Sequence, residues 1–142
     1  LSHLYNEYRE NRFRAMGCFL GELMHITSYG VAYVVLDADT IRRFDLRDGE
    51  TEGFVNLPLG ISEVKMSIFL REDDGHYRVS IRSKKGWSAN KLAAESFNGG
   101  GHECAAGGRL YFPGDIADRE MAADYVETVA ARFMQLSSPI VG

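Results

Sequence analysis

Residues 98–108 contain five glycines and two alanines, and this composition constrains the local fold more than any other stretch. Three consecutive glycines cost backbone entropy on folding and bury almost no side chain, so the backbone itself is what the run provides. A backbone without Cβ atoms can approach a ligand closely and direct its N–H groups at an anion. We therefore interpret Gly99, Gly100 and Gly101 as a phosphate cradle with His102, a hydrogen-bond donor, at its edge. A mobile glycine linker is the alternative, which the structured patterns on both sides of the run disfavour.

The size and composition of the chain predict one globular domain. Its 142 residues suffice for a buried core, and 45% of them are hydrophobic and 25% charged. The net charge of −4 excludes a general attraction to nucleic acid, although positions 71–109 carry a local concentration of Lys and Arg. Two cysteines, with no signal peptide and no membrane-spanning run, favour a cytoplasmic protein without a membrane partner. Because the chain begins at Leu1 in a helix-like pattern, we expect a piece of a longer protein.

Strands are predicted where apolar residues alternate or run continuously. The alternation is clearest on both sides of Asp74-Gly75, a dipeptide that signals a hairpin turn. A continuous run of apolar and β-branched residues predicts one buried strand earlier in the chain. In chain order the predicted strands are 31–36, 63–71, 76–83 and 109–112.

Helices are predicted from apolar residues at helical spacing that follow a capping residue. They cover 4–24 with an interruption near Gly17, 40–44 after Asp37 or Asp39, 88–97 after Ser88, and 115–136 after Asp115. Ala105 and Ala106 predict a short helical turn, and residues 52–58 fit either a short helix or an irregular crossing. Strands and helices alternate, so we expect a single α/β domain with a mixed sheet of about four to five strands and helices packed on it.

A second group of polar residues lies near the end of the strand at 76–83. Ser80 and Arg82 belong to its polar face, and Ser83 stands at its tip. A guanidinium matches phosphate in bidentate fashion, and serine hydroxyls add neutral hydrogen bonds. Ligands of α/β proteins gather at strand ends, so these residues and the glycine run predict an anion site. Taken alone, Arg82 also fits an ordinary solvated strand residue.

Four segments together resemble the DHH-associated domain, the C-terminal substrate-binding domain of DHH phosphoesterases. They are Val79-Ser80-Ile81-Arg82-Ser83, Gly99-Gly100-Gly101-His102, Ala105-Ala106-Gly107 and Glu52-Gly53-Phe54-Val55-Asn56. The sequence is most similar to oligoribonucleases that are also 3′-phosphoadenosine 5′-phosphate phosphatases, often called exopolyphosphatase-related. RecJ-type exonucleases and cyclic-dinucleotide phosphodiesterases share the glycine–histidine motif.

The resemblance implies a division of the chain and a binding site. Residues 1–13 would be the tail of an interdomain linker helix, and 14–142 the substrate-binding domain. The ligand would be a nucleotide or a short single-stranded oligonucleotide. Its binding residues would be Ser80, Arg82, Ser83, Gly99, Gly100, Gly101 and His102.

The catalytic half of that family is absent from this sequence. The resemblance implies a partner domain at the N-terminal side of the same polypeptide, in which an Asp-His-His motif and further aspartates bind two manganese ions. No Asp-His-His occurs here, and His102 with Cys104 gives too few ligands for a closed metal site. We therefore expect no metal and no catalytic residue in this chain, and no hydrolysis by it alone. The alternative is a stand-alone module that binds a nucleotide or cyclic dinucleotide without catalysis.

One local departure and one further set of candidates remain. Asn98 stands where many relatives have a fourth glycine, and asparagine also tolerates unusual backbone angles. Tyr77, Trp87 and Phe97 are candidates for stacking on a base, although aromatic side chains beside a hairpin more often pack in the core.

Overall fold

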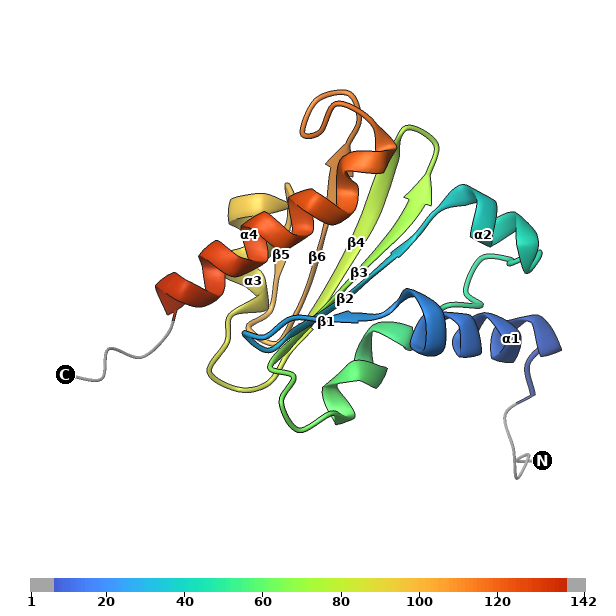
Figure 1. Cartoon of the computed structure of the whole chain (residues 1–142), viewed down its shortest axis with the longest axis horizontal. Coiled ribbons are helices and arrows are strands. Elements are labelled where there is room, and N and C mark those ends of the chain that lie inside the picture. The colour runs from blue at the N-terminus through green and yellow to red at the C-terminus, as the bar shows by residue number, and fades with distance from the viewer. Residues whose placement is uncertain (1–6, 138–142) are drawn as a thin grey trace.

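The computed structural model describes residues 7–137 of the chain (Figure 1). Strands and helices alternate, as the sequence predicts for an α/β domain. Along the chain they are α1 (Glu10–Cys18), the π-helical turn η1 (Phe19–Leu23), β1 (His25–Ile26), β2 (Val31–Leu36), α2 (Ala38–Arg43), the 3₁₀ segment η2 (Phe54–Gly60), β3 (Met66–Asp73), β4 (His76–Ser83), α3 (Ala89–Ser96), β5 (Gly100–Gly101), β6 (Ala105–Tyr111), the 3₁₀ turn η3 (Arg119–Met121) and α4 (Ala122–Ser137).

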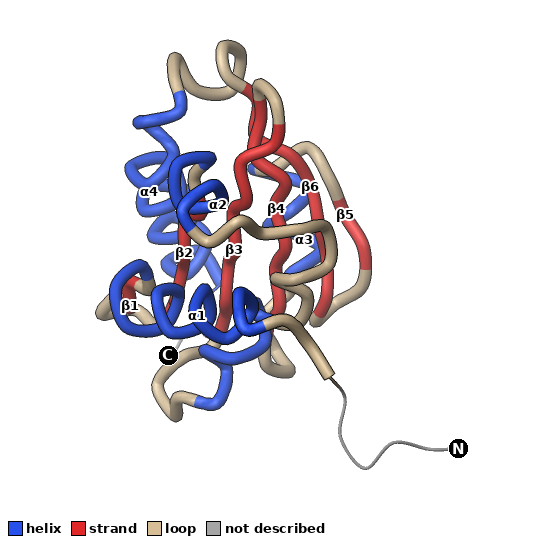
Figure 2. The backbone as a smooth tube through the Cα atoms, turned by 90° about the vertical axis from the view of Figure 1, so that its right-hand side faces the viewer, coloured by secondary structure: helices blue, strands red, loops and turns tan. Residues whose placement is uncertain are grey.

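The strands form one mixed sheet in the order β1-β2-β3-β4-β6-β5 (Figure 2). Only β2 and β3 are parallel, and the other neighbouring strands are antiparallel. The sheet has six strands rather than the four to five predicted, because β1 and β5 are two-residue edge strands. Segments this short give no detectable alternation in a sequence.

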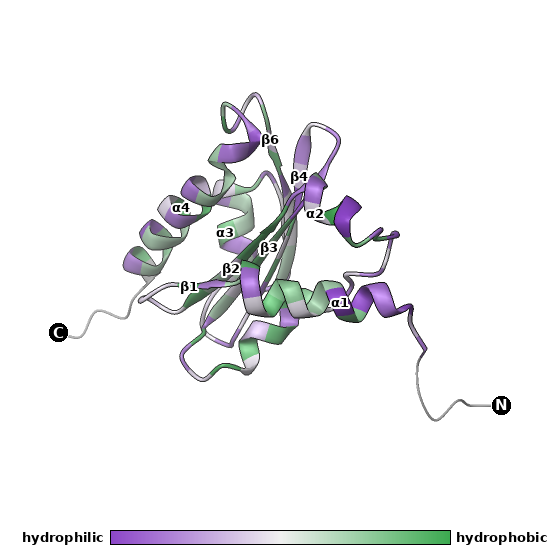
Figure 3. Ribbon diagram, turned by 45° about the vertical axis from the view of Figure 1, so that its right-hand side comes forward, coloured by the Kyte–Doolittle hydropathy of each residue, from purple (hydrophilic) through white to green (hydrophobic). Residues whose placement is uncertain are grey.

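Two layers of helices cover the sheet. In Figure 1, α3 and α4 lie against one face, and α1 and α2 lie against the other. The core on the α3–α4 side includes Met66, Ile68 and Leu70 of β3, which alternate with the residues that face α1 and η2. On that second side, the rings of Phe19, Phe54 and Phe69 pack edge to face. Figure 3 shows the polar outer side of α4 in purple.

The hairpin of β3 and β4 is confirmed as predicted. Asp74 and Gly75 form its turn with φ angles of 33° and 81°, and Leu70 pairs with Val79 in the middle of the ladder. The first five residues of β3 are all buried, including those at polar-face positions such as Ser67. Side chains on both faces are covered because helices and turns lie on both sides of this strand.

Two local predictions are wrong. Ala105 and Ala106 begin a strand instead of a helical turn, because they pair with Arg82 and Ile81 of β4. Asp115 does not cap the last helix, because its carboxylate accepts hydrogen bonds from Tyr111 N and Asn98 Nδ2, both at 2.8 Å. The helix α4 therefore begins at Ala122, after η3.

Other boundaries follow the sequence more closely. Asp37, rather than Asp39, caps the second helix by accepting a hydrogen bond from Thr40 N at 2.9 Å. The first helix begins at Glu10 and passes into η1, so the expected interruption falls after Gly17. The predicted helical residues 4–6 and most of the predicted linker at 1–13 lie outside the described residues or ahead of α1. Among residues 7–137, no helix combines the length and apolar character needed to cross a bilayer.

Candidate functional site

The polar face of β4 forms one wall of a hollow of about 440 Å³. Arg78, Ser80 and Arg82 alternate along the strand with side chains buried under α3 and α4. Phe69 and Arg71 of β3 line the same hollow. The opposite wall comes from the loop that follows α2 and from η2, and consists of Gly49, Thr51, Glu52, Gly53, Val55 and Asn56. The structure thus brings the predicted pair Ser80 and Arg82 together with two arginines that we did not predict.

The arginines of this hollow have no ionic partner within the described chain. Arg71, Arg78 and Arg82 each lack a carboxylate oxygen within 4.0 Å among residues 7–137, although Glu52 also lines the hollow. Arg71 Nη1 donates to Thr51 Oγ1 at 2.8 Å. Arg82 Nη1 donates to two backbone oxygens, of β4 and β6, at 2.8 and 3.3 Å. The remaining N–H groups of Arg82 are available to an anion, which a guanidinium can bind through two parallel hydrogen bonds.

Ser83 lies on the opposite face of β4 and does not join this group. Its side chain is buried, and its hydroxyl is within hydrogen-bond distance of the backbone oxygens of Trp87 and Glu103. Its backbone N–H donates to Cys104 O at 3.0 Å. Ser83 therefore fastens the end of β4 to the neighbouring loops, and the geometry removes it from the candidate binding site.

Two serine substitutions separate these roles. Ser83→Ala is expected to lower the free energy of unfolding by about 1–3 kcal/mol, because the buried Ser83 hydroxyl no longer donates to the backbone oxygen of Trp87. Ser80→Ala, the matched control in the same strand, should change stability by less than about 0.5 kcal/mol, because its half-exposed hydroxyl has no hydrogen-bond partner within the described chain. Urea unfolding of both variants measures the difference. Equal effects would contradict the assignment of the two serines to opposite faces.

The glycine run begins at the end of α3. Asn98 has a φ of 52°, and Gly99 N donates to Ala93 O at 3.1 Å, as at helix ends closed by a left-handed residue. Asn98 thus supports the left-handed turn for which glycine is the usual residue. Gly101 N donates to Asn90 Oδ1 at 2.9 Å.

These hydrogen bonds correct the prediction of a cradle of free N–H groups. The N–H groups of Gly99 and Gly101 already have partners within the protein, and His102 N donates to Ala105 O at 2.8 Å in the turn between β5 and β6. The run is glycine-rich mainly because it passes close to other backbone. A Cβ on Gly99 would lie 1.9 Å from Gly107 O.

Gly100 is the exception in the run. A Cβ there would meet only the Asn90 side chain, with Oδ1 at 3.2 Å, and no backbone atom within 4 Å. A Cβ on Gly101 would instead lie 2.8 Å from Ala105 O, and the φ of Gly101 is 153°. Gly100 is thus the glycine of the triplet that has no backbone packed against it. The role of the triplet in ligand binding stays a prediction.

His102 is exposed in the turn that joins β5 to β6. Its backbone pairs with Ala105, which is the register partner of Arg82 on the next strand. Two strand spacings therefore separate His102 from Arg82, about 10 Å between backbones. One ligand of nucleotide size can span this distance, although His102 does not line the hollow itself.

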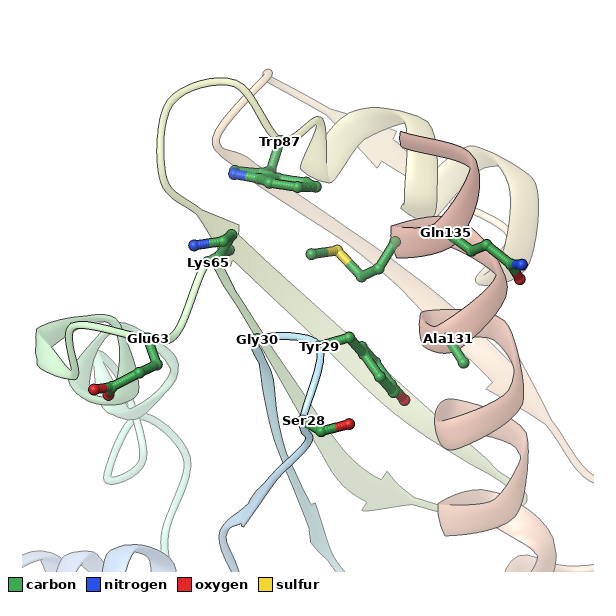
Figure 4. A pocket seen from close by; sticks show the side chains of 9 residues that line it. Ser28, Tyr29, Gly30, Glu63, Lys65, Trp87, Ala131 and Gln135 are labelled. Atoms are coloured by element: carbon green, nitrogen blue, oxygen red, sulfur yellow. The ribbon is translucent and has the colours of Figure 1, made fainter. Parts of the chain in front are cut away.

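The aromatic candidates of the sequence divide in the structure. Tyr77 and Phe97 are buried in the core and cannot stack on a ligand. Trp87 lines a separate, larger hollow of about 650 Å³ between the turn at Tyr29 and the end of α4 (Figure 4). Lys65 also borders that hollow, which contains none of the predicted binding residues.

The described residues do not fit a metal centre. Residues 7–137 contain no group of three or more His, Cys, Asp or Glu side chains that could hold an ion. Cys104 is half-buried and follows His102 by two residues, and both belong to the β5–β6 turn. A two-metal hydrolase needs a set of carboxylate and histidine ligands for both ions, and this part of the chain does not supply one.

Comparison with known proteins gives a consistent match. Residues 27–130 match the family model of the DHHA1 domain. The chain is 35% identical over 94 residues to a probable bifunctional oligoribonuclease and PAP phosphatase, NrnA, of Streptococcus mutans, covering 66% of this chain and 30% of the relative. It is 32% identical over 123 residues to NrnA of Bacillus subtilis, covering 85% of this chain and 38% of the relative.

A solved structure extends the match to the fold. The crystal structure of an exopolyphosphatase-related protein from Bacteroides fragilis is 40% identical, with a TM-score of 0.82. The alignment covers 94% of this chain and 38% of that one. This chain therefore spans less than two-fifths of the length of these three relatives.

Proposed function

Because the chain belongs to the DHHA1 domain family, we propose that it is the substrate-binding part of a phosphoesterase that acts on short oligoribonucleotides or 3′-phosphoadenosine 5′-phosphate. The observation that supports this function is the hollow beside β4, where three arginines have no carboxylate partner in the described chain. A group of unpaired guanidinium groups on one surface is suited to phosphate.

Each candidate residue has a distinct part in the proposed site. Arg82 binds the terminal phosphate through its free N–H groups, and the Ser80 hydroxyl adds a neutral hydrogen bond. Gly100 leaves room for the ligand beside the turn, and His102 reaches it from the turn's exposed side. Gly99 and Gly101 act indirectly by setting the path of that turn.

Hydrolysis requires groups that these residues do not supply. We assign it to an N-terminal domain of the same polypeptide, with an Asp-His-His motif and two bound metal ions, manganese by resemblance to the family. The relatives' greater length supports such a domain, because they extend well beyond the matched part. The two free cysteines also fit a reducing compartment, and we place the protein in the cytoplasm. A stand-alone binding module would lack the upstream domain in its gene.

Arg82→Ala tests the site directly. We expect it to weaken the binding of 3′-phosphoadenosine 5′-phosphate by about 10- to 100-fold, because a bidentate arginine–phosphate contact contributes roughly 1.5–3 kcal/mol. The fold should remain, because Arg82 lies on the polar face of its strand. Isothermal titration calorimetry measures the affinity.

Arg132→Ala is the matched control. Arg132 is an exposed arginine of α4, on the opposite layer, and its removal changes the net charge by the same amount. The affinity of the Arg132→Ala variant for 3′-phosphoadenosine 5′-phosphate should stay within about twofold of that of the unmodified chain, because exposed charges separated by more than a Debye length are screened. Equal losses in the two variants, or no loss in either, would contradict the proposed site.

A further inference from the structure

Three arginines lie directly opposite one another on neighbouring strands. Arg71 of β3 pairs with Arg78 of β4, which in turn pairs with Arg109 of β6. Paired residues share one face of a sheet, and adjacent strands are about 4.8 Å apart, so the row is about 10 Å long. Like charges placed directly opposite each other destabilise a sheet.

No ion pair in the described chain compensates this repulsion. None of the three arginines forms an ion pair with a carboxylate within 4.0 Å among residues 7–137. Arg78 and Arg109 are exposed, and neither has a hydrogen-bond partner for its side chain within that range. The nearby carboxylate of Asp115 already accepts bonds from Asn98 and from the Tyr111 backbone. Within the described chain, the hydrogen bond from Arg71 to Thr51 is therefore the only side-chain partner that holds a member of the row.

The row of Arg71, Arg78 and Arg109 extends from the hollow described above to a second hollow. This hollow, of about 520 Å³, lies over β4, β6 and the start of the glycine run. Arg78 and Ser80 line both hollows, so the two are neighbours on the same polar face. Arg109, Asn98 and Tyr111 complete the polar and aromatic lining of the second.

Tyr111 adds an exposed aromatic ring, which a site for phosphate alone does not require. It lies on the same face as Arg109, two residues further along β6, and 43% of the residue is exposed. Its ring lies beside that of His76, with 5.7 Å between centroids. An exposed aromatic ring next to unpaired arginines is the combination with which proteins bind single-stranded nucleic acid, because the bases stack and the phosphates pair.

We propose that Arg78, Arg109 and Tyr111 form a second nucleotide subsite for a single-stranded oligoribonucleotide. The proposal rests on the proposed function, in which Arg82 holds the terminal phosphate. Arg82 lies four positions after Arg78 in an extended strand, so their backbones are about 13 Å apart. One phosphate group is too small to sit between backbones that far apart and contact both. The arginine row therefore binds the next phosphodiester, and Tyr111 stacks on the base that belongs to it.

The test compares two ligands of different length. One is 3′-phosphoadenosine 5′-phosphate, and the other is a triadenylate with a 5′-phosphate. The variant Arg78→Gln/Arg109→Gln should weaken binding of the triadenylate at least tenfold more than binding of the bisphosphate, because Arg78 borders both hollows and Arg109 borders only the second. The salt dependence of triadenylate binding should fall by about 0.7 in its logarithmic slope, since the row neutralises one phosphodiester of the single strand. Fluorescence anisotropy on the 142-residue chain measures both.

Tyr111→Ala and an additional competitor identify the ligand class. Loss of stacking should weaken triadenylate binding about 5- to 100-fold and leave the bisphosphate unchanged. Tripolyphosphate, which has charge but no bases, should compete poorly. If tripolyphosphate competes as well as triadenylate and Tyr111→Ala has no effect, the row binds a simple polyanion and the nucleotide subsite is overturned.

The remaining outcomes separate this proposal from the proposed function. If the double arginine variant loses both ligands equally, the row serves the same phosphates as Arg82 and there is no second subsite. If Arg82→Ala leaves bisphosphate binding intact, the proposed function fails, whatever the double variant does. The double variant should also melt at the same or a higher temperature, because it removes a repulsive row, and a clear fall would assign the arginines a structural role.

Discussion

Gly99→Ala is expected to lower the free energy of unfolding by at least about 3 kcal/mol, because its methyl group would need space that backbone atoms already fill. The new Cβ would lie 1.9 Å from Gly107 O and 2.6 Å from Gly108 Cα. These atoms belong to β6, which is fixed between β4 and β5 by its ladders. The strand can yield only by giving up pairs in the sheet, so the substitution is costly even though alanine is small.

Gly100→Ala is the control for this prediction. It adds the same methyl group one residue later, where the nearest atom is Asn90 Oδ1 at 3.2 Å on a side chain that can move. Its stability should change by less than about 1 kcal/mol. Guanidinium unfolding followed by circular dichroism measures both variants. Similar stabilities for the two would show that the glycine run is looser than its close contacts indicate.

The strands that the sequence predicts well are those with a complete two-residue period. In β3 and β4 one face is apolar at three successive positions, and a register shift of one residue would expose that face, so the pattern alone determines the hairpin. The pairing of Ile68 with Ile81 follows from this period and from the position of the Asp74-Gly75 turn.

The first part of β6, before the predicted strand at 109–112, could not be predicted in the same way. Ala105 and Gly107 have low strand propensity, and their conformation depends on pairing with β4, more than twenty residues earlier. The close packing of Gly108 is also invisible in the sequence, since a Cβ there would lie 2.0 Å from Phe97 O. Both facts depend on contacts between distant segments rather than on local pattern.

The candidate site shows the same limit. The polar face of the strand predicts Ser80 and Arg82, and the same alternation also indicates Arg78, which lies on that face. Arg71 and Arg109 join them only through the register of three strands, which no local signal specifies. The prediction includes Ser83 because it stands at the tip of the strand, whereas its position in the two-residue period puts it on the other face from Arg82.

The second large effect is expected at Phe97, where α3 meets the glycine run. Phe97 is 0% exposed, and its ring packs edge to face on Tyr125 with 5.8 Å between centroids. Its backbone oxygen accepts a hydrogen bond from Arg109 N at 2.6 Å. The side chain thus fills the core at the point where its own backbone contacts β6.

Phe97→Ala should therefore lower the free energy of unfolding by about 3–5 kcal/mol, as expected for an aromatic side chain removed from a closed core. Phe13→Ala removes the same side chain from α1, where 55% of the residue is exposed, and should cost less than about 1 kcal/mol. Urea unfolding measures both. Because the cavity would lie beside Gly108, the Phe97 variant should also bind 3′-phosphoadenosine 5′-phosphate more weakly at temperatures where it is still folded. A folded Phe97→Ala protein with unchanged affinity would show that the position of the glycine run does not depend on this part of the core.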